Sequence, residues 1–183
     1  MRVITGSARG RRLITPEGLD VRPTPEKVKE ALFSAIQFDV EGRRVLDLFA
    51  GSGQLGIEAL SRGAKSCVFV DMSPVSIKTV QKNLETTKLD QKAKVLKSDY
   101  ASFCAMSRDV FDIVFLDPPY SKGLLLPAIK GVLPLLSDYA TVICEHPPEV
   151  ELPEAIGGFK VDRVYNYNKV ILTLYRKGGS DEE

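Results

Sequence analysis

Apolar and polar positions follow two different periods along the middle of this chain. Short apolar runs typical of buried strands occur at residues 44–49, 66–71, 93–97, 111–116 and 140–145. Between these runs apolar residues recur every three or four positions, most regularly over residues 74–87 and less regularly over residues 124–136. Strands that alternate with helices predict an α/β fold, with a mostly parallel sheet covered by helices on both faces.

The first part of the chain departs from this alternation. Residues 1–23 are basic and punctuated by glycine, and Val3-Ile4 and Leu13-Ile14 predict two short strands of a β-hairpin. Thr24 is predicted to cap the next helix, with Pro25 at its first helical position. We therefore expect an N-terminal extension made of a hairpin and a helix.

The last part of the chain differs as well, because two strand-like runs follow each other without a helix. Residues 161–167 and 169–176 flank a polar turn, which indicates an antiparallel hairpin at the edge of the sheet. We expect a basic arm over residues 1–23 and one domain over residues 24–183, whose seven-stranded sheet ends in this hairpin.

Composition and charge narrow the class of protein. Of the 183 residues 44% are apolar, enough for one domain core, and a net charge of +1 by itself predicts no polyanionic partner. Arg9, Arg11 and Arg12 lie close together near the N-terminus, which leaves open nucleic-acid contact or a solvated surface. The three cysteines are scattered and predict neither a disulfide framework nor a zinc site, and no apolar run is long enough for a membrane span. We expect a protein of the reducing cytoplasm that uses no metal.

A glycine-rich turn after the first strand is the first candidate for chemistry. Gly51, Gly53 and Gly56 have the spacing G-x-G-x-x-G, which lets a ligand approach the main chain. Asp71 ends the second strand twenty positions after Gly51, where a carboxylate can accept hydrogen bonds from the ribose of a nucleotide cofactor. NAD and S-adenosylmethionine both contain such a ribose, so this spacing does not distinguish them.

Two features favour S-adenosylmethionine over NAD. Asp47 precedes Gly51 by four positions, where its charge would repel the pyrophosphate of NAD and attract the ammonium of a methionine moiety. The second feature follows the fourth strand. The tetrapeptide Asp117-Pro118-Pro119-Tyr120 resembles the D/N/S-P-P-Y/F/W motif of methyltransferases that act on amino groups of nucleic-acid bases.

Carboxylates accompany four successive strands at the edge where an open α/β sheet binds ligands. They are Asp47, Asp71, Asp99 and Asp117. A single aspartate after a strand is commonly a cap or a turn residue, whereas four in succession indicate a site.

The tetrapeptide suits the chemistry of an exocyclic amine, whose lone pair is delocalised into the base. Asp117 and the main-chain carbonyl of Pro118 would accept the two N–H groups and turn the lone pair toward a methyl donor. The prolines would hold these acceptors rigidly, and Tyr120 would stack on a base flipped out of its helix. The N6 amine of adenine suits this arrangement as well as the N2 amine of guanine.

Beyond these motifs, nearly the whole chain is similar to the RsmD family. The matching stretches include Arg22-Pro23-Thr24, Glu30-Ala31-Leu32-Phe33, residues 47–53, residues 56–64 and residues 117–120. The resemblance implies a class I, Rossmann-like methyltransferase fold. It also implies an S-adenosylmethionine-dependent enzyme that methylates the N2 amine of one guanine in 16S ribosomal RNA of the small subunit.

The resemblance assigns roles to individual residues. The cofactor is expected to contact Asp47, Gly51, Gly53, Asp71 (at the ribose), Met72, Asp99 (at the adenine amine) and Tyr100. The guanine is expected at Asp117, Pro118, Pro119 and Tyr120, and RNA phosphates at Arg9, Arg11, Arg12 and Arg22. The partner would be 16S ribosomal RNA or an assembly intermediate of the small subunit, bound by a monomer.

Three other functions stay open at this point. They are an adenine-N6 methyltransferase of RNA or DNA, an NAD-dependent oxidoreductase, and an RNA-binding module without catalysis. His146 has no role in the resemblance and is expected at the surface or at a strand end.

Overall fold

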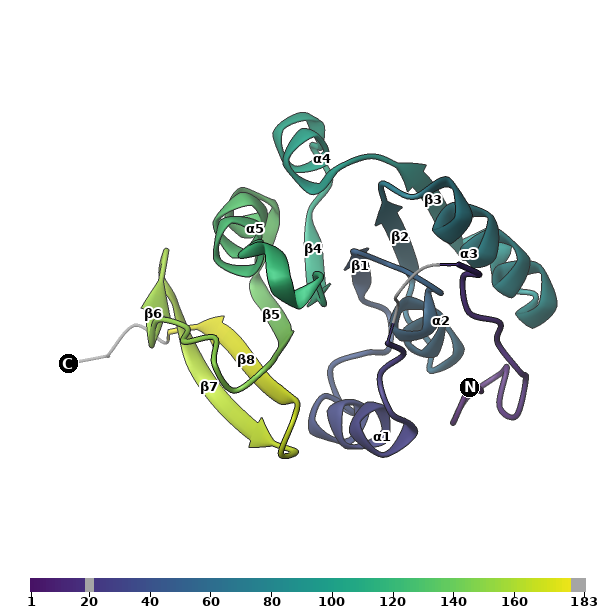
Figure 1. Ribbon diagram of the computed structural model, residues 1–183, viewed down its shortest axis with the longest axis horizontal. Coiled ribbons are helices and arrows are strands. Elements are labelled where there is room, and N and C mark those ends of the chain that lie inside the picture. The colour runs from purple at the N-terminus through teal and green to yellow at the C-terminus, as the bar shows by residue number, and fades with distance from the viewer. Residues whose placement is uncertain (19–21, 179–183) are drawn as a thin grey trace.

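The computed structural model describes residues 1–18 and 22–178, which form one twisted sheet with helices on both faces (Figure 1). The α-helices are α1 (Glu26–Ala35), α2 (Gln54–Ser61), α3 (Pro74–Thr87), α4 (Tyr100–Met106) and α5 (Leu125–Val132). The strands are β1 (Arg44–Leu48), β2 (Ser66–Asp71), β3 (Ala93–Lys97), β4 (Phe111–Leu116), β5 (Leu136–His146), β6 (Ala155–Ile156), β7 (Phe159–Asn166) and β8 (Ile171–Lys177). Within these described ranges the sheet has the order β3-β2-β1-β4-β5-β8-β7-β6.

Strand β1 lies where the order of the sheet reverses. From β1 the chain runs outward to β2 and β3 on one side, and then returns to β4 and β5 on the other. All pairs from β3 to β5 are parallel, so their carboxyl ends lie along one edge. Ligands of open α/β sheets bind beyond this edge at the point of reversal.

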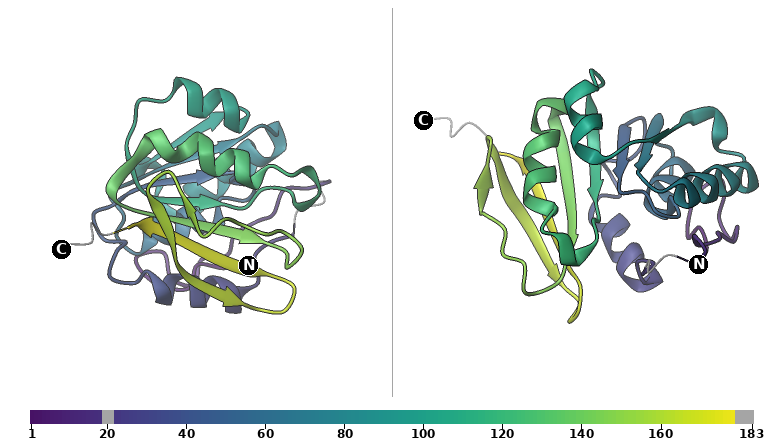
Figure 2. Two further views of the ribbon diagram at one scale, coloured as in Figure 1. Left: turned by 90° about the vertical axis from the view of Figure 1, so that its left-hand side faces the viewer. Right: turned by 45° about the horizontal axis from the view of Figure 1, so that its top comes forward.

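Two apolar layers hold the helices against the sheet, and Figures 1 and 2 show helices on both of its faces. Helices α1, α2 and α3 pack on one face, and α4 and α5 pack on the other. Successive side chains of β4 enter opposite layers, because Phe115 belongs to the first core and Leu116 to the second. No helix in the described part of the chain has the length and apolar character that crossing a membrane requires.

The N-terminal arm packs on the domain. Val3, Ala8 and Leu13 are buried in the core beneath α1, α2 and α3. The predicted hairpin is present but short: Arg2 and Arg12 form one antiparallel bridge, and the N–H groups of Val3 and Leu13 donate to the carbonyl oxygens of Arg11 and Met1 at 2.9 and 3.0 Å. Main-chain groups of the arm bond to helix side chains where a longer ladder would have continued.

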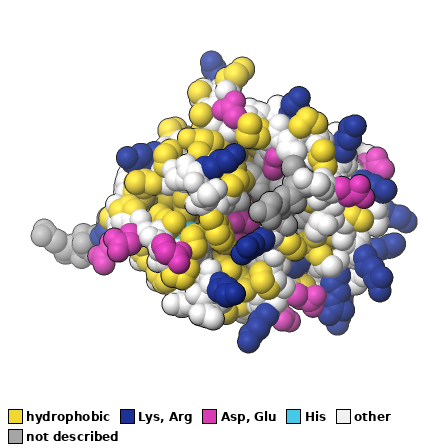
Figure 3. All heavy atoms as spheres, viewed as in Figure 1, with side chains coloured by type: hydrophobic (Ala, Val, Ile, Leu, Met, Phe, Trp, Pro, Cys, Tyr) yellow, Lys and Arg dark blue, Asp and Glu magenta, His cyan; other side chains and the backbone are white. Residues whose placement is uncertain are grey.

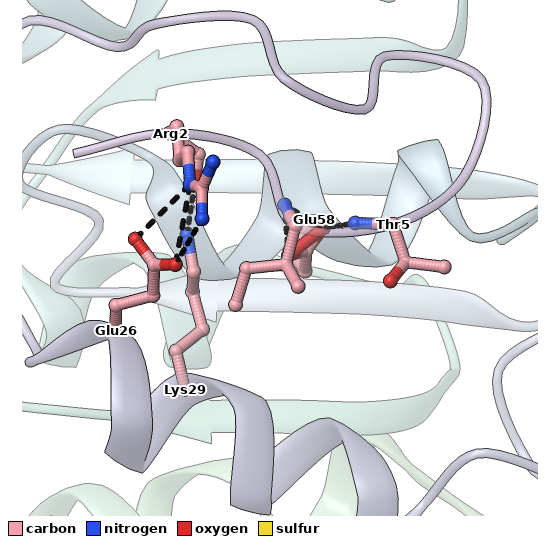
Figure 4. A network of polar contacts seen from close by, with 6 residues as sticks. Arg2, Thr5, Glu26, Lys29 and Glu58 are labelled. Carbon is pink, nitrogen blue, oxygen red and sulfur yellow. Dashed lines mark hydrogen bonds and ion pairs between the residues drawn. The ribbon is translucent and has the colours of Figure 1, made fainter.

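Buried polar side chains of α1 and α2 hold this arm in place (Figure 4). Glu58 is fully buried and accepts hydrogen bonds from the N–H groups of Ile4, at 2.8 Å, and Thr5, at 3.4 Å. The ammonium group of Lys29 donates to the carbonyl oxygen of Arg2 at 2.6 Å. Burial lowers the pKa of Lys29, and the nearby Glu58 carboxylate partly opposes this effect.

The sequence predicts most elements correctly, and the C-terminal hairpin is confirmed as β7 and β8. The sheet has eight strands and not seven, because the short strand β6 pairs with β7 across the turn at Gly157 and Gly158. The helix predicted over residues 124–136 is shorter, since a 3₁₀ turn that contains Pro134 follows α5 and β5 already begins at Leu136.

Thr24 does not cap the helix that follows it. Helix α1 begins at Glu26 with Pro25 at the capping position, and no side chain bonds to its first turn. The Thr24 hydroxyl donates to Glu145 Oε2 at 2.8 Å, which joins the start of α1 to the end of β5. A long-range partner therefore replaces the local one that the sequence suggested.

Candidate functional site

The register of the parallel strands places three carboxylates in one row. Leu116 pairs with Leu48 of β1 on one side and with Cys144 of β5 on the other. The residues one position further along are therefore neighbours across the edge. They are Asp71, Phe49, Asp117 and Glu145, in the order β2, β1, β4 and β5. Since adjacent strands lie about 4.8 Å apart, the carboxylate row formed by Asp71, Asp117 and Glu145 spans the point where the strand order reverses.

The glycine turn lies at the centre of this row and has an unusual backbone. Phe49, Gly51 and Gly53 have φ angles of 69°, 58° and 79°. The angle at Phe49 is strained, because side chains other than glycine rarely adopt it. A Cβ atom on Gly53 would lie 3.2 Å from the methyl groups of Val80, so the turn has no room for a side chain there.

Asp71 holds the glycine turn in this shape. Its Oδ2 accepts a hydrogen bond from the N–H of Gly51 at 2.9 Å, and its Oδ1 accepts one from Ser73 at 2.9 Å. Each oxygen keeps a second lone pair, so its contact with a ribose stays a prediction. Met72 follows it and is 67% exposed at the same edge.

Asp47 lies beneath the turn and not on its open side. It is 3% exposed, and its Oδ2 accepts a hydrogen bond from the N–H of Gly56 at 3.0 Å. Burial raises the pKa of Asp47 to about 8, although the bond from Gly56 opposes the shift. Its contact with a cofactor amine stays a prediction, because the carboxylate is directed at the first turn of α2.

Asp99 and Tyr100 begin helix α4 beside the same turn. Asp99 is the N-cap, and its Oδ1 accepts from the N–H of Ser102 at 2.9 Å, a bond that lowers the pKa of Asp99. The ring of Tyr100 lies against that of Phe49, with centroids 5.7 Å apart. The structure therefore brings both residues to the glycine turn.

The tetrapeptide continues β4 past the carboxylate row. Asp117 is partly buried, and burial together with the nearby carboxyls of Glu145 and Asp47 raises its pKa well above the usual range. Pro118 is buried, whereas Pro119 is exposed and Tyr120 is 40% exposed at the start of a 3₁₀ turn. The pKa of Tyr120 is raised by burial of its hydroxyl and then by the charge of Glu145.

The sequence prediction missed Glu145. This side chain is 5% exposed and accepts the hydroxyl proton of Thr24, and burial raises its pKa. The sequence contained a sign of this position, because Glu145 lies at the end of the predicted fifth strand as Asp117 lies at the end of the predicted fourth. His146 is also buried, with Nε2 2.8 Å from the hydroxyl of Thr173, so it lies at a strand end and not at the surface.

The predicted RNA-binding arginines fall into two places. Arg9, Arg11 and Arg12 are exposed on the arm, where the N–H of Ala8 donates to Ser61 at the last turn of α2. Helix α2 has eight residues, so this turn lies about 12 Å along the helix from the glycine turn. Figure 3 shows Lys and Arg side chains gathered where Figure 1 places the arm and α3. Arg22 is exposed and lies near Tyr120. The positive charge of Arg22 partly opposes the rise in the pKa of Tyr120.

No three histidine, cysteine, aspartate or glutamate side chains of residues 1–18 and 22–178 are grouped so that they could hold an ion. The site therefore consists of a strained glycine turn, a row of carboxylates and an exposed aromatic ring.

The chain is similar to known proteins over almost its whole length. A family model described as "Conserved hypothetical protein 95" matches residues 1–176. The chain is 43% identical to "Putative rRNA methyltransferase YlbH" of Bacillus subtilis, covering 98% of this chain and 100% of that protein. It is 35% identical to "Ribosomal RNA small subunit methyltransferase D" of Escherichia coli K12, covering 100% of this chain and 92% of that protein.

A solved structure agrees with these sequence matches. "Putative methyltransferase yhhF from Escherichia coli" superposes with a TM-score of 0.88 at 36% identity, covering 98% of this chain and 99% of the other. Because the family model and these relatives span almost the whole chain, the protein belongs to the RsmD family, whose model carries the description Conserved hypothetical protein 95.

Proposed function

We propose that this protein uses S-adenosylmethionine to methylate the N2 amine of a guanine in 16S ribosomal RNA. Methyl transfer to ribosomal RNA follows from membership of a family whose relatives are named as rRNA methyltransferases. The observation that carries the proposal is the position of Asp117, one strand away from the glycine turn and at the same edge. This register puts Asp117, which would accept from the target amine, beside the turn that would hold the methyl donor.

The glycine turn fits the cofactor. Its positive φ angles and the absence of space for a Cβ at Gly53 leave main-chain atoms as its lining. The residues that would hold the cofactor are Asp47, Gly51, Gly53, Asp71, Met72, Asp99 and Tyr100. When bound, S-adenosylmethionine supplies a sulfonium-linked methyl group that a nitrogen lone pair can attack in line.

Asp117 and Pro118 would position the amine. The carboxylate and the Pro118 carbonyl each accept one N–H group, which directs the lone pair out of the plane of the base. After transfer the cationic amine releases a proton, which the neighbouring Asp117 carboxylate can accept. Asp117 need not be a strong base, since the amine becomes acidic only once it carries the methyl group.

Tyr120 would hold the extruded base. It is 40% exposed, which leaves part of its ring for contact, and stacking of a base on an aromatic ring contributes about 1–3 kcal/mol. Arg22 lies near Tyr120, where its guanidinium would bind an adjoining phosphate.

The arm would extend this RNA surface. Arg2 and Arg12 line a shallow hollow of about 450 Å³ beside Glu26, and Arg9 and Arg11 are exposed nearby. We propose that Arg9, Arg11 and Arg12 bind phosphates of 16S ribosomal RNA or of an assembly intermediate of the small subunit. The three cysteines are free, and we propose that the protein acts as a monomer in the cytoplasm.

Labelled S-adenosylmethionine tests the proposal. The protein is incubated with unmethylated small ribosomal subunits, naked ribosomal RNA or duplex DNA, and digested nucleosides are analysed for the label. We expect N2-methylguanosine from ribosomal RNA or subunits. Label on adenine would overturn the guanine assignment, and binding of NAD without binding of S-adenosylmethionine would overturn the reaction class.

Asp117→Ala tests the residue that carries the mechanism. We expect turnover to be abolished and the affinity for S-adenosylmethionine, measured by calorimetry, to be nearly unchanged. Asp109→Ala is the matched control, because Asp109 is an exposed aspartate near the opposite end of the same strand. Loss of cofactor binding with turnover retained in Asp117→Ala would contradict this role.

A further inference from the structure

Glu145 is the neighbour of Asp117 across the edge of the sheet. The two residues follow the paired positions Leu116 and Cys144 of parallel strands, so their side chains extend from the same row. Glu145 is 5% exposed, and its Oε2 accepts the hydroxyl proton of Thr24 at 2.8 Å. The hydroxyl of Tyr120 also lies near this carboxyl and lowers its pKa, against the larger effect of burial.

Two carboxyls side by side, of which Glu145 is buried and Asp117 is partly buried, need N–H or O–H donors. Each carboxylate has about four acceptor positions, and the hydroxyl of Thr24 fills only one of those on Glu145. Among the hydrogen bonds of residues 1–18 and 22–178, none reaches the Asp117 carboxylate. The mutual repulsion of the pair contributes to the raised pKa of Asp117. A ligand edge with two adjacent donors would relieve this cost.

Guanine and adenine differ at the atom beside the target amine. Next to its N2 amine guanine carries N1–H, a donor, so its edge presents two parallel N–H groups. Next to its N6 amine adenine carries N1 with a lone pair, an acceptor. A second carboxylate beside the one that binds the amine therefore attracts the guanine edge and repels the adenine edge.

We infer that Glu145 selects guanine by accepting the N1–H of the target base, while Asp117 accepts from its N2 amine. The inference rests on the proposed function and deepens it, since it decides which of the two amines that suit Asp117-Pro118-Pro119-Tyr120 is methylated. The hydrogen bond from Thr24 holds one oxygen of the Glu145 carboxylate on the strand beside Asp117. Because Thr24 lies just before α1, the segment that leads into this helix takes part in the selection of the base.

The test compares guanine with 2-aminopurine, which keeps the 2-amino group but has a lone pair at N1. The guanosine that the wild-type protein labels is first mapped, and ribosomal RNA with 2-aminopurine riboside at that position is then prepared. The variant Glu145→Gln retains an oxygen for Thr24 and presents an NH₂ group to the base. Glu145→Leu removes the acceptor in every rotamer.

We expect wild-type kcat/KM to fall strongly on 2-aminopurine. Glu145→Gln should lower kcat/KM on guanine by about 10- to 100-fold, the effect of one lost charged hydrogen bond, and leave 2-aminopurine unchanged or improved. Thr24→Val removes the bond that orients Glu145, so it should lower kcat/KM on guanine and leave kcat/KM on 2-aminopurine nearly unchanged. Binding of S-adenosylmethionine and the unfolding midpoint show that each variant is folded.

Equal losses on both bases in Glu145→Gln and Glu145→Leu would overturn the inference and make Glu145 an anchor for Thr24 only. Failure of the wild-type protein to label guanine in any RNA is a different result, because it would overturn the proposed function itself.

Discussion

Gly56, the third glycine of the turn motif, lies where α2 crosses β2. A Cβ atom there would lie 2.3 Å from Cε1 of Phe69 and 2.7 Å from Sγ of Cys67, and both of these side chains are buried. The motif suggested a residue that faces a ligand, whereas the structure shows a residue that permits close packing of helix on sheet. Its N–H also bonds to Asp47, so a shift of α2 would disturb the floor of the turn.

Gly56→Ala is expected to destabilise the protein by about 1–3 kcal/mol, because the added methyl group overpacks a full core. Gly131→Ala is the matched control, since Gly131 also lies inside a helix but its Cβ would be 3.3 Å from Cys104 Sγ. Gly131→Ala should lower the free energy of unfolding by less than about 1 kcal/mol, because the better helix propensity of alanine offsets the tight contact. Urea denaturation measures both, and equal midpoints would refute the packing role of Gly56.

At the scale of elements, an ion pair joins β1 to β4 at the end of the sheet opposite the carboxylate row. Arg44 donates to both oxygens of Asp112, each at 3.0 Å, and its own N–H adds a bond of 2.9 Å to Oδ2. Burial by itself would raise the pKa of Asp112, but the bonds from Arg44 outweigh it and lower the pKa to about 2 from 3.8. The pair fixes the register that places Asp117 beside the glycine turn.

This ion pair predicts that the free energy of unfolding decreases as the pH falls below 4. Since the folded pKa of Asp112 is below the unfolded one, its contribution of about 2 kcal/mol is present above pH 4 and is lost as the pH falls toward 2. Asp112→Asn should lower the free energy of unfolding at pH 6 and reduce its decline between pH 4 and pH 2. Parallel stability curves for variant and wild type over that range would contradict the prediction.

At the scale of the whole molecule, the arm and the domain are one packed unit. Asn83 of α3 accepts from the N–H of Ile14 and donates to the carbonyl oxygens of Ile14 and Ser52, each at 2.9 Å. The same side chain therefore touches the arm and the glycine turn. The exposed arginines of the arm are presented from a fixed base.

Charge reversal at Arg9, Arg11 and Arg12 to Glu should weaken RNA binding and leave cofactor affinity and stability unchanged. If each arginine binds one phosphate, the slope of log K against log salt should fall in magnitude by about 2 to 3. The matched control reverses three exposed lysines that line a hollow of about 620 Å³ at the amino ends of the strands, namely Lys65, Lys92 and Lys94. Equal loss in both triple variants would show that net charge, and not the arm, decides binding.

Local patterns in the sequence determined a large part of this protein. The strand and helix periods, the glycine turn, the capping of α3 by Ser73 and the tetrapeptide at Asp117 all depend on residues near one another in the chain. Such features can be recognised because backbone angles and burial impose a fixed spacing on them. They were sufficient to predict the parallel sheet, the reversed hairpin and two of the three carboxylates in the row, Asp71 and Asp117.

Only the tertiary structure decided how distant residues meet. Thr24 and Glu145 are 121 positions apart, and Ile4 and Glu58 are 54 apart, so no periodicity links them. The register of the strands places Glu145 beside Asp117 and directs Asp47 beneath the turn. A shift of the register by one residue would move every side chain of a strand to the other face of the sheet. The sequence supplies the chemical groups through local rules, and packing of the whole chain decides which of them face each other, because hydrogen bonds and burial are satisfied between segments and not along them.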